Sequence, residues 1–530
     1  MAKKTFDVET TKVESIDIAT PKKAENIHSP AGNSKQSENF RAFYPLDPNF
    51  TLANELKHSQ DKTLKLSIES PIGSGLVLSM VDGTIGKGLQ LETSITSKLI
   101  TVNTKKISST SQMIEDLWDL WSKTPEACDF YGKSSFGELC RIAATNAYNT
   151  GDVLQFIGIR KWGDIFVPYV RFYDGRSVQN DQKQQDTNKC TAGVHIDDQG
   201  RETGYTIAIQ KGTYEEVYKK VDREVDGING TKRVQYNLIC NGRIQPNQRR
   251  GRALILPSIE NMILLNRFNE AEVVKAMIQS YITGYIEVDK DMAKQGGFQG
   301  DDPLLGTPTE QPADESGEND SPITFGPGYI HRLNPGETFN LPESKSPVPQ
   351  FWSFMEGQLK IICMGMGIPY EVALQVFNSN YSASQASIQA AARRWDIERQ
   401  TLATEMVRNV YNLFLDLMVA QGFVSCPGYT KNPFVKAAWR DANWHGPVIL
   451  NIDPVKNAKS ASLRIANHTS TYQDECRAQG KDFDKVVAQR ASEEALLKSL
   501  GLKPDLSGKD KPEEVEEPEE KNSNQKGEKE

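Results

Sequence analysis

The histidines and cysteines are the first guide to the chemistry that this sequence could carry. Its six histidines lie far apart, and no two of them have the spacing of a zinc-binding pair. Its seven cysteines include no Cys-x-x-Cys pair, which is typical of free, mostly buried thiols in a reducing cytosol. A Gly-x-Ser-x-Gly nucleophile motif is also absent from the sequence. The pattern therefore predicts no metal site, no catalytic residue and no cofactor.

Two further motifs could suggest chemistry, but each has a simpler explanation. The Gly-rich stretch of Gly83, Gly86 and Gly88 lacks the Lys-Ser/Thr of a phosphate-binding loop, so we interpret it as a turn before a strand. The adjacent carboxylates Asp197 and Asp198 could be a metal or acid–base pair. Adjacent residues of a hairpin point to opposite faces or lie in its turn, so a role in the turn is favoured.

The basic residues offer candidates for contacts with nucleic acid or with another subunit. The densest basic cluster includes Arg249, Arg250 and Arg252, and it lies just before a predicted helix over 256–284. The simpler alternative for this cluster is solvated charge or ion pairs within the subunit. Lys360 is the only cation of a second predicted helix, and its simpler explanation is a solvated side chain.

Two helices of different character, with a polar break between them, must position any site in the second half of the chain. The first is apolar, spans 350–366 and ends before Pro369, because proline cannot continue a helix. The break over 375–381 is uncharged and rich in Asn and Ser. The second helix is predicted to start with a capping box of Ser382 and Gln385. At 1.5 Å per residue it would be on the order of 60 Å long, which suggests a strut in an extended or multi-subunit body.

The rest of the pattern predicts an α+β fold. Helices and strands alternate through residues 39–250, where the apolar run 76–81 is too short to decide between strand and helix. No run reaches the ~18 uninterrupted apolar residues of a membrane helix, and the first residues lack the apolar segment of a signal peptide. We therefore expect no membrane association.

The charge is unevenly distributed along the chain. The formal net charge is -8, and most of the excess acid lies in 291–322 and 503–530, which leaves a nearly neutral folded body. We expect 291–322 to be a flexible loop and 503–530 a disordered tail. A neutral body lacks the basic patches of a typical nucleic-acid binder. Solvated segments that aid solubility explain the acidic runs equally well.

The most specific motifs flank the polar break. The runs Met366-Gly367-Ile368-Pro369-Tyr370-Glu371 and Asn380-Tyr381-Ser382-Ala383-Ser384-Gln385 resemble the signature of the lambda-type portal proteins of tailed phages. This chain has Ala383 and Gln385 where the family pattern has Ser and Arg, so it lacks the Arg of that pattern. Shorter elements extend the resemblance in matched order from about Asn39 to Glu494. They are Gly151-Asp152, Gln248-Arg249-Arg250-Gly251, Leu333-x-Pro335-Gly336-Glu337, Asp453-Pro454-x-Lys456 and Gly480-x-Asp482.

This resemblance implies a ring of identical subunits, typically twelve, at one capsid vertex, through which double-stranded DNA enters and leaves. The neutral body suits a channel that lets DNA pass without gripping it. The family architecture maps onto the chain as follows: a disordered arm at 1–38, the wing at 39–250 and 374–450, stem helices at 251–284 and 348–373, a small β clip at 285–347, a helical crown region at 451–502 and the acidic tail at 503–530.

The same resemblance implies the partners and the location of the protein. The clip would dock the terminase large subunit and, later, the head-completion or adaptor proteins. The major capsid and scaffold proteins would surround the ring, which would be assembled in the host cytoplasm and retained in the virion. The ATP-driven motor would be the terminase, which agrees with the missing phosphate loop.

The polar break would then be the loop that projects into the channel. We hypothesise that Asn378, Asn380 and Tyr381 face DNA, and the whole candidate loop is Phe377, Asn378, Ser379, Asn380 and Tyr381. A simple turn between helices is the alternative for this segment. For the whole chain, the alternatives are another ring-forming head–tail connector without a packaging role, and a cytosolic α+β enzyme with a catalytic pocket.

Overall fold

The computed structural model of the 530-residue chain divides into two compact units, Met1–Pro447 and Val448–Glu530. It describes residues 48–95, 99–100, 102–181, 186–211, 216–227, 232–281, 285–288, 337–340, 351–377, 380–448 and 454–501. The predictions for the arm 1–38, the acidic loop 291–322 and the tail 503–530 lie outside these residues. None of the described helices is long and apolar enough to cross a membrane.

The described elements alternate between helices and short strands, so the chain is a mixed helix and sheet protein. The helices of the first unit are α1 (Pro48–Glu69), α2 (Pro71–Thr84), α3 (Thr104–Lys123), α4 (Pro125–Cys128), α5 (Phe136–Thr150), α6 (Ile259–Tyr281), α8 (Phe351–Met366), α9 (Tyr370–Leu374), α10 (Tyr381–Leu402), α11 (Arg408–Ala420) and α12 (Pro433–Trp439). The strands are β1 (Gln90–Thr93), β2 (Asp152–Trp162), β3 (Ile165–Asp174), β4 (Cys190–Thr191), β5 (Val194–Ile196), β6 (Glu202–Gln210), β7 (Glu216–Asp222), β8 (Glu224–Asp226), β9 (Lys232–Val234), β10 (Tyr236–Cys240), β11 (Tyr285–Val288), β12 (Glu337–Asn340) and β13 (Ala442–His445).

The ambiguous apolar run 76–81 is helical, in the middle of α2. The Ser70 side chain accepts a hydrogen bond from the Gly73 amide, and Pro71 occupies the first turn, so the chain has a strong helix start there. Gly83 belongs to this helix, and the predicted turn contains only Gly86 and Gly88, both with positive φ. After Trp439 the chain forms β13, which pairs with β1.

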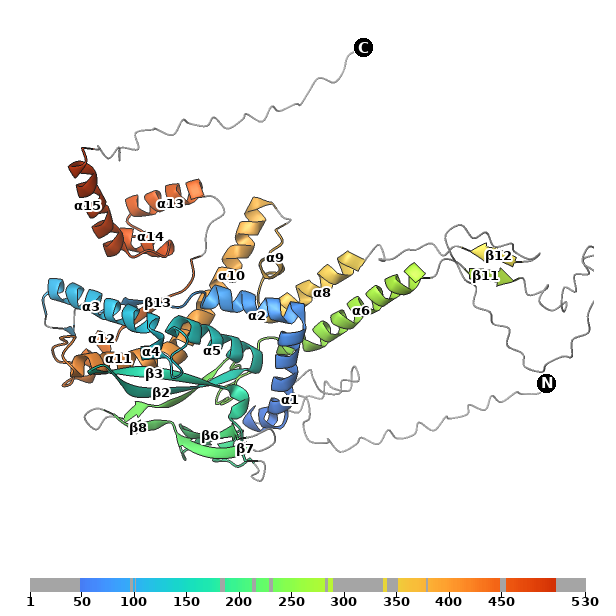
Figure 1. Ribbon diagram of the computed structural model, residues 1–530, viewed down its shortest axis with the longest axis horizontal. Coiled ribbons are helices and arrows are strands. Elements are labelled where there is room, and N and C mark those ends of the chain that lie inside the picture. The colour runs from blue at the N-terminus through green and yellow to red at the C-terminus, as the bar shows by residue number, and fades with distance from the viewer. Residues whose placement is uncertain are drawn as a thin grey trace, which may run out of the picture. The chain divides into compact units, whose positions relative to one another are not determined.

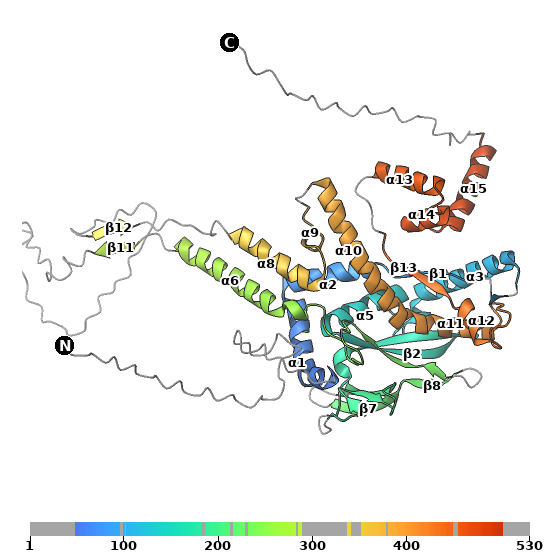
Figure 2. The ribbon, with the colours of Figure 1, turned by 180° about the vertical axis from the view of Figure 1, so that it is seen from behind.

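The central sheet has the strand order β10-β2-β3, and all its pairs are antiparallel. Figures 1 and 2 show α5 and α11 on one side of this sheet and β6, β7 and β8 on the other. The opposite sides follow from alternation along β2. Leu154 packs in a small cluster with Tyr205 and Ile207 of β6, whereas Val153 and Ile157 belong to the main core.

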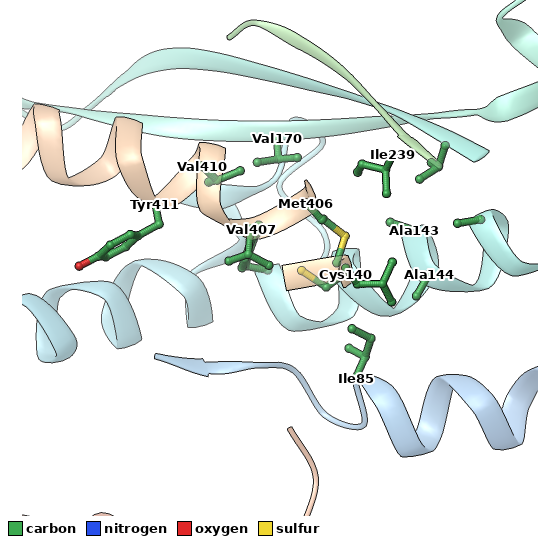
Figure 3. Close-up of a cluster of buried hydrophobic side chains, with 14 of the residues drawn as sticks. Ile85, Cys140, Ala143, Ala144, Val170, Ile239, Met406, Val407, Val410 and Tyr411 are labelled. Atoms are coloured by element: carbon green, nitrogen blue, oxygen red, sulfur yellow. The ribbon is translucent and has the colours of Figure 1, made fainter. Parts of the chain in front are cut away.

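The main core lies between the sheet and the helices. Figure 3 shows Val170 and Ile239 of the strands above Met406, Val407 and Val410, with Cys140, Ala143 and Ala144 of α5 below. The cysteines are all free, as predicted, and most of them are buried. Burial raises the pKa of Cys240 to about 12 and that of Cys363 to about 11, so both thiols are protonated near neutrality.

The second sheet has the order β4-β5-β6-β7 and contains the predicted hairpin. The Asp197 carboxylate accepts hydrogen bonds from the backbone amides of Gln199 and Arg201, at 2.9 and 2.8 Å. Asp198 instead pairs with Lys189 at 2.8 Å. The two carboxylates thus serve the turn and a surface ion pair, and no group of three or more His, Cys, Asp or Glu among the described residues could hold a metal ion.

Helices α6 and α8 are joined by aromatic contacts. A 3-10 turn, Leu256–Ser258, leads into α6, so the predicted helix over 256–284 starts and ends within three residues of its expected bounds. The ring of Phe268 lies 5.7 Å from that of Phe351 and 4.8 Å from that of Phe354. Strands β11 and β12 form an antiparallel pair in the chain between the two helices.

The second unit contains α13 (Pro454–Ala466), α14 (Tyr472–Ala478) and α15 (Phe483–Ser499). Arg464 of α13 and Glu475 of α14 form a two-pronged ion pair, at 2.8 Å for both contacts. Helix α15 follows Gly480, and the Asp482 side chain caps it at the Lys485 amide.

Candidate functional site

The segment from α8 to α10 contains the polar break and the structure that holds it. Helix α8 ends in a Schellman motif, in which the Ile368 amide donates to the Cys363 carbonyl and the Gly367 amide to the Met364 carbonyl, both at 3.1 Å. Gly367 has a φ of +73°, which glycine adopts without strain. Ile368 is buried, and Pro369 is the N-cap of the short helix α9. The Gly-Ile-Pro motif therefore forms the turn between α8 and α9 and sets where α9 begins.

The cap of α10 differs from the prediction. The Asn380 side chain accepts a hydrogen bond from the Ala383 amide at 2.9 Å, and the helix begins at Tyr381. Ser382 thus lies in the first turn rather than at the N-cap. Asparagine is among the best N-cap residues, so the chain enters the helix two residues earlier than the Ser-Ala-Ser-Gln pattern indicated.

Side chains of α8, α9 and α10 hold the three helices together. The Lys360 ammonium lies 2.9 Å from the Glu356 carboxylate and 4.7 Å from the centre of the Tyr370 ring. The hydrogen bond with Glu356 raises the pKa of Lys360, and the same bond lowers the pKa of Glu356. The Ser387 hydroxyl of α10 donates to Glu371 of α9 at 2.5 Å. Lys360 is thus exposed but paired within its own subunit.

The structure places part of the candidate loop. The side chain of Phe377 is 45% exposed, and its neighbour Val376 is also exposed. Asn380 is exposed, and its side chain is engaged as the helix cap. Asn378 and Ser379 lie outside the described residues, as does the side chain of Tyr381. The loop therefore presents an apolar side chain, Phe377, between two capped helices.

Arg250 is buried, so the structure corrects its prediction as a DNA or intersubunit contact. Its side chain is 3% exposed, and its guanidinium forms a two-pronged pair with Asp152 at 2.6 and 2.9 Å. The three remaining donors bind the carbonyls of Val178, Ala192 and Gly175, at 2.6, 2.6 and 2.8 Å. All five donors are used inside the subunit, which is the alternative that the sequence left open.

The other two arginines of the cluster are half-buried. The Arg249 guanidinium donates to the Thr191 hydroxyl at 3.3 Å, and its backbone amide donates to Asn49 at 2.9 Å. Burial lowers the pKa of Arg252. The basic cluster thus links α1, β2 and β4 rather than forming an open positive patch.

The predicted long helix is continuous from Tyr381 to Ala420, but the sequence pattern missed the π turn Ala403–Val407 within it. The backbone carbonyls of this turn are met by amide side chains of the sheet. Asn237 donates to the Glu405 carbonyl at 2.7 Å, and Gln155 donates to the Met406 carbonyl at 2.9 Å. The Glu405 carboxylate accepts from the Cys240 amide at 3.1 Å. The only sequence signal was one amide residue in each of two strands, with apolar or aromatic residues on both sides of it.

Replacing Gln155 with leucine should cost about 1–3 kcal/mol of unfolding free energy, because a buried carbonyl would lose its donor. The measurement is the urea midpoint of the full chain, with the slope of the transition unchanged. Gln421→Leu is the matched control, because that amide also binds a backbone, at Phe166, but in an exposed setting. Equal midpoints for Gln155→Leu and the parent would contradict the role of this contact.

Arg399 connects the long helix to α2. Its Nε and Nη2 atoms donate to the carbonyls of Thr84 and Gly83, both at 3.0 Å. These carbonyls lie at the C-terminal end of α2, where an α-helix leaves its last carbonyls without partners. A cation is also favoured there by the helix dipole. The loop is therefore supported by a helix that is fixed to α2 and, through the π turn, to the sheet.

A comparison with models of known protein families identifies the family of this chain. The model of the phage portal protein, lambda family, matches residues 36–399, which is more than half of the chain. The chain belongs to this family. Portal proteins are structural components of the virion rather than enzymes, so the absence of catalytic motifs in the sequence agrees with the assignment.

Two curated relatives carry the same description at low identity. The chain is 22% identical over 439 residues to portal protein B of Escherichia phage lambda, and the match covers 80% of each chain. It is 23% identical over 443 residues to the portal protein of Escherichia phage N15, which covers 80% of this chain and 81% of the relative. Among solved structures, the neck of an empty gene transfer agent particle matches with a TM-score of 0.42 and 11% identity, over 79% of this chain and 93% of that one.

Proposed function

We propose that this portal protein forms a closed ring of about twelve copies at one capsid vertex, as the channel for DNA packaging and ejection. Family membership supports this role. The observation on the molecule itself that supports it best is an apolar surface on α6 and α8, the proposed stem helices, which a single subunit leaves open to water. The alternative, a ring-forming connector without a packaging role, would differ in the function of the loop.

The exposed apolar residues of this stem surface are large and numerous. They are Leu264, Val273, Val274 and Met277 on α6, and Trp352, Phe354, Ile361 and Met364 on α8. Trp352 is 74% exposed and Met364 is 76% exposed. Large apolar side chains that are exposed on two neighbouring helices are typical of a protein interface. In a ring, the neighbouring copies would cover it on both sides.

The loop between α9 and α10 is the proposed contact with DNA. Its residues Phe377, Asn378, Ser379, Asn380 and Tyr381 carry no charge. Affinity for DNA comes mainly from Lys and Arg contacts to phosphate, so an uncharged loop would slide along the duplex rather than hold it. The burial of Arg250 removes one of the cations that could have gripped DNA from a single subunit, whereas Lys360 is exposed and pairs with Glu356.

The partners follow from the proposed architecture. Residues 285–347, which contain the β11–β12 pair, would form the clip that docks the terminase large subunit and later the head-completion proteins. Residues 39–250 and 374–450 would form the wing, beside the capsid and scaffold proteins, and 451–502 the crown region. The motor would be the terminase, assembled with the ring in the host cytoplasm.

The native mass of the purified chain tests the ring. Twelve copies of the 59.1 kDa subunit would give a hollow particle of roughly 0.7 MDa by negative-stain microscopy and native mass measurement. Met277→Asp should shift the population to smaller species, because a charge would be buried in the subunit contact. Asn269→Asp, which adds the same charge at an exposed polar site of α6, is the control. A chain that stays monomeric with scaffold or terminase present would contradict the proposal.

A further inference from the structure

One face of the central sheet carries aromatic rings interleaved with arginines, and no part of the portal assignment uses it. This Arg–aromatic face comprises Phe130, Tyr131, Phe156, Arg160, Tyr169, Arg171, Tyr173, Arg233 and Tyr236. It lies on the side of the sheet opposite to Gln155, whose amide binds the π turn. In Figure 1 this is the side of β2 and β3 that faces away from α5 and α11.

The rings form a continuous chain across the strands. Ring centroids are 4.9 Å apart for Tyr131 and Phe130, 5.8 Å for Phe130 and Tyr169, and 5.9 Å for Tyr169 and Phe156. Tyr236 extends the chain, 4.9 Å from Phe156. Phe130 is 40% exposed and Tyr131 is 61% exposed, so the chain of rings reaches solvent at the β3 edge of the sheet.

A glycine allows the central ring to lie flat on the sheet. Gly158 faces Tyr169 across the β2–β3 pair, and a Cβ atom at Gly158 would lie within 2.6 Å of three atoms of the Tyr169 side chain. The guanidinium of Arg160 lies over the same ring, 4.3 Å from its centre. The sequence therefore builds a layer of strand, ring and cation at this position.

Arg171 is surrounded by rings rather than by acceptors. Its guanidinium lies 4.8 Å from the Phe130 centroid, 5.4 Å from that of Tyr131 and 4.4 Å from that of Tyr173. Its buried Nε atom has no hydrogen-bond partner among the described residues. A donor in this state is costly unless an incoming acceptor or water meets it.

The face has an excess of positive charge. Arg160 donates only to the carbonyls of Glu126 and Phe130, and Arg233 to the carbonyl of Ile157. Within the described part of the chain, no carboxylate pairs with Arg160, Arg171 or Arg233. Most other described arginines, such as Arg176 and Arg440, do pair with one.

The composition of the face favours a protein partner over nucleic acid. Tyrosine, phenylalanine and arginine are the residues enriched in the central part of protein interfaces, and Tyr and Arg are frequent hot spots. No lysine contributes to the face, whereas nucleic-acid surfaces need many phosphate contacts for affinity. The expected ligand is therefore a peptide that presents carboxylates and apolar groups together.

The chain itself contains one segment with this chemistry. Residues 512–520 read Pro-Glu-Glu-Val-Glu-Glu-Pro-Glu-Glu, with six glutamates, no lysine, and an apolar residue at every third position. Polyproline II has three residues per turn, so Pro512, Val515 and Pro518 would line one side of such a helix and the glutamates the other two. Proline-rich helices of this type dock on aromatic-lined surfaces.

We propose that the Arg–aromatic face is the docking site for residues 512–520 of a second copy of the chain. Pro512, Val515 and Pro518 lie on the rings, and the flanking glutamates pair with Arg160, Arg171 and Arg233. The proposal rests on the proposed ring, because a ring brings many copies of the tail and of the face together.

The test measures the binding of a fluorescently labelled peptide of residues 512–520 to the full-length chain, by anisotropy. The chain used has its own six tail glutamates replaced by glutamine, so that the face is free. We expect saturable binding that weakens as salt rises. A peptide with all six glutamates replaced by glutamine, and a peptide of the same composition in which the period of three is broken, should each bind at least tenfold more weakly.

Variants of the face complete the test. Arg160→Gln with Arg171→Gln should weaken binding at least tenfold, and Arg408→Gln, an exposed arginine on α11, should leave it unchanged. Thermal unfolding of each variant checks that it is folded, and the peptide controls do not depend on any change in the protein. Equal binding of the acidic and neutral peptides, an unchanged affinity of the double variant, or displacement of the peptide by oligo-dT would overturn the proposal.

A measurement of native mass distinguishes a failure of the docking site from a failure of the ring. A ring that forms but does not bind the peptide would overturn the docking site and leave the portal function standing. A chain that binds the peptide with the expected specificity but remains monomeric would support the docking chemistry and overturn the ring.

Discussion

Arg250→Met should destabilise the subunit by about 3–5 kcal/mol, the usual cost of removing one partner of a buried ion pair. The variant would leave the Asp152 carboxylate, which is fully buried, without its counter-charge. It would also leave the carbonyls of Val178, Ala192 and Gly175 without the donors described above. Because typical domains are stable by only 5–15 kcal/mol, a loss of this size should appear as a large fall in the thermal midpoint and in soluble yield.

Two further variants serve as controls for the predicted loss of stability. Arg249→Met removes a neighbouring half-buried arginine with a single side-chain bond to Thr191, and should cost less than about 1 kcal/mol. The double variant Arg250→Met with Asp152→Leu removes both charges and should recover part of the loss, because an apolar pair avoids a buried unpaired charge. A single variant with the parent's midpoint, or a double variant that is less stable than the single one, would contradict the argument.

Removing the candidate channel loop should abolish the formation of DNA-filled heads while rings still assemble. A deletion of residues 376–380 would remove the loop, but it would also remove residues that hold the ends of the two helices. The structure refines this design, because the Asn380 side chain caps α10 and the Val376 amide closes α9 on the Glu371 carbonyl. We therefore expect the deletion of 377–379 to remove the loop and to leave both helix ends intact.

The measurement is the ratio of filled to empty heads by electron microscopy in a complementation assay, with ring mass as the check on assembly. Asn380→Ala removes the cap and keeps the loop, so it separates the two effects. The loss of the cap should cost about 1 kcal/mol, and because only one of the five loop residues changes, this variant should reduce packaging less than the deletion does. Normal packaging by the deletion variant would exclude a role for the loop and would favour the simple helix–helix turn.

Much of the architecture was predictable because it follows from local rules. The helix stop at Pro369, the long helix after the break and the hairpin at Asp197 were all predicted from the sequence, and the structure confirms them. The short run 76–81 could not be assigned by period alone. Its helix depends on the Ser70-Pro71 start, which precedes the apolar residues.

The other misses depend mostly on contacts between distant parts of the chain, whereas the cap of α10 was a local error of two residues. Arg250 was grouped with an exposed basic cluster, because its partner Asp152 lies 98 positions away in the sequence. Helical periodicity could not predict the π turn, because the amides that stabilise it come from β2 and β10. The Arg–aromatic face likewise combines residues of β2 and β3 with residues that follow α4. Only the register of the strands brings these side chains together.

The π turn also fixes the rotational phase of the long helix. It adds one residue to a helical turn, and one residue of an α-helix corresponds to a rotation of about 100°. Tyr411 and Phe414, which follow the π turn, lie in the core. Relative to them, Arg399, which precedes the turn and contacts α2, is rotated by that angle from the direction that an unbroken α-helix would give it. A single-residue deletion between 403 and 407 would turn Arg399 away from α2 even if the helix stayed intact. The direction in which the loop leaves this helix thus depends on the π turn, some twenty residues away, and on the two amide side chains of the sheet that bind it.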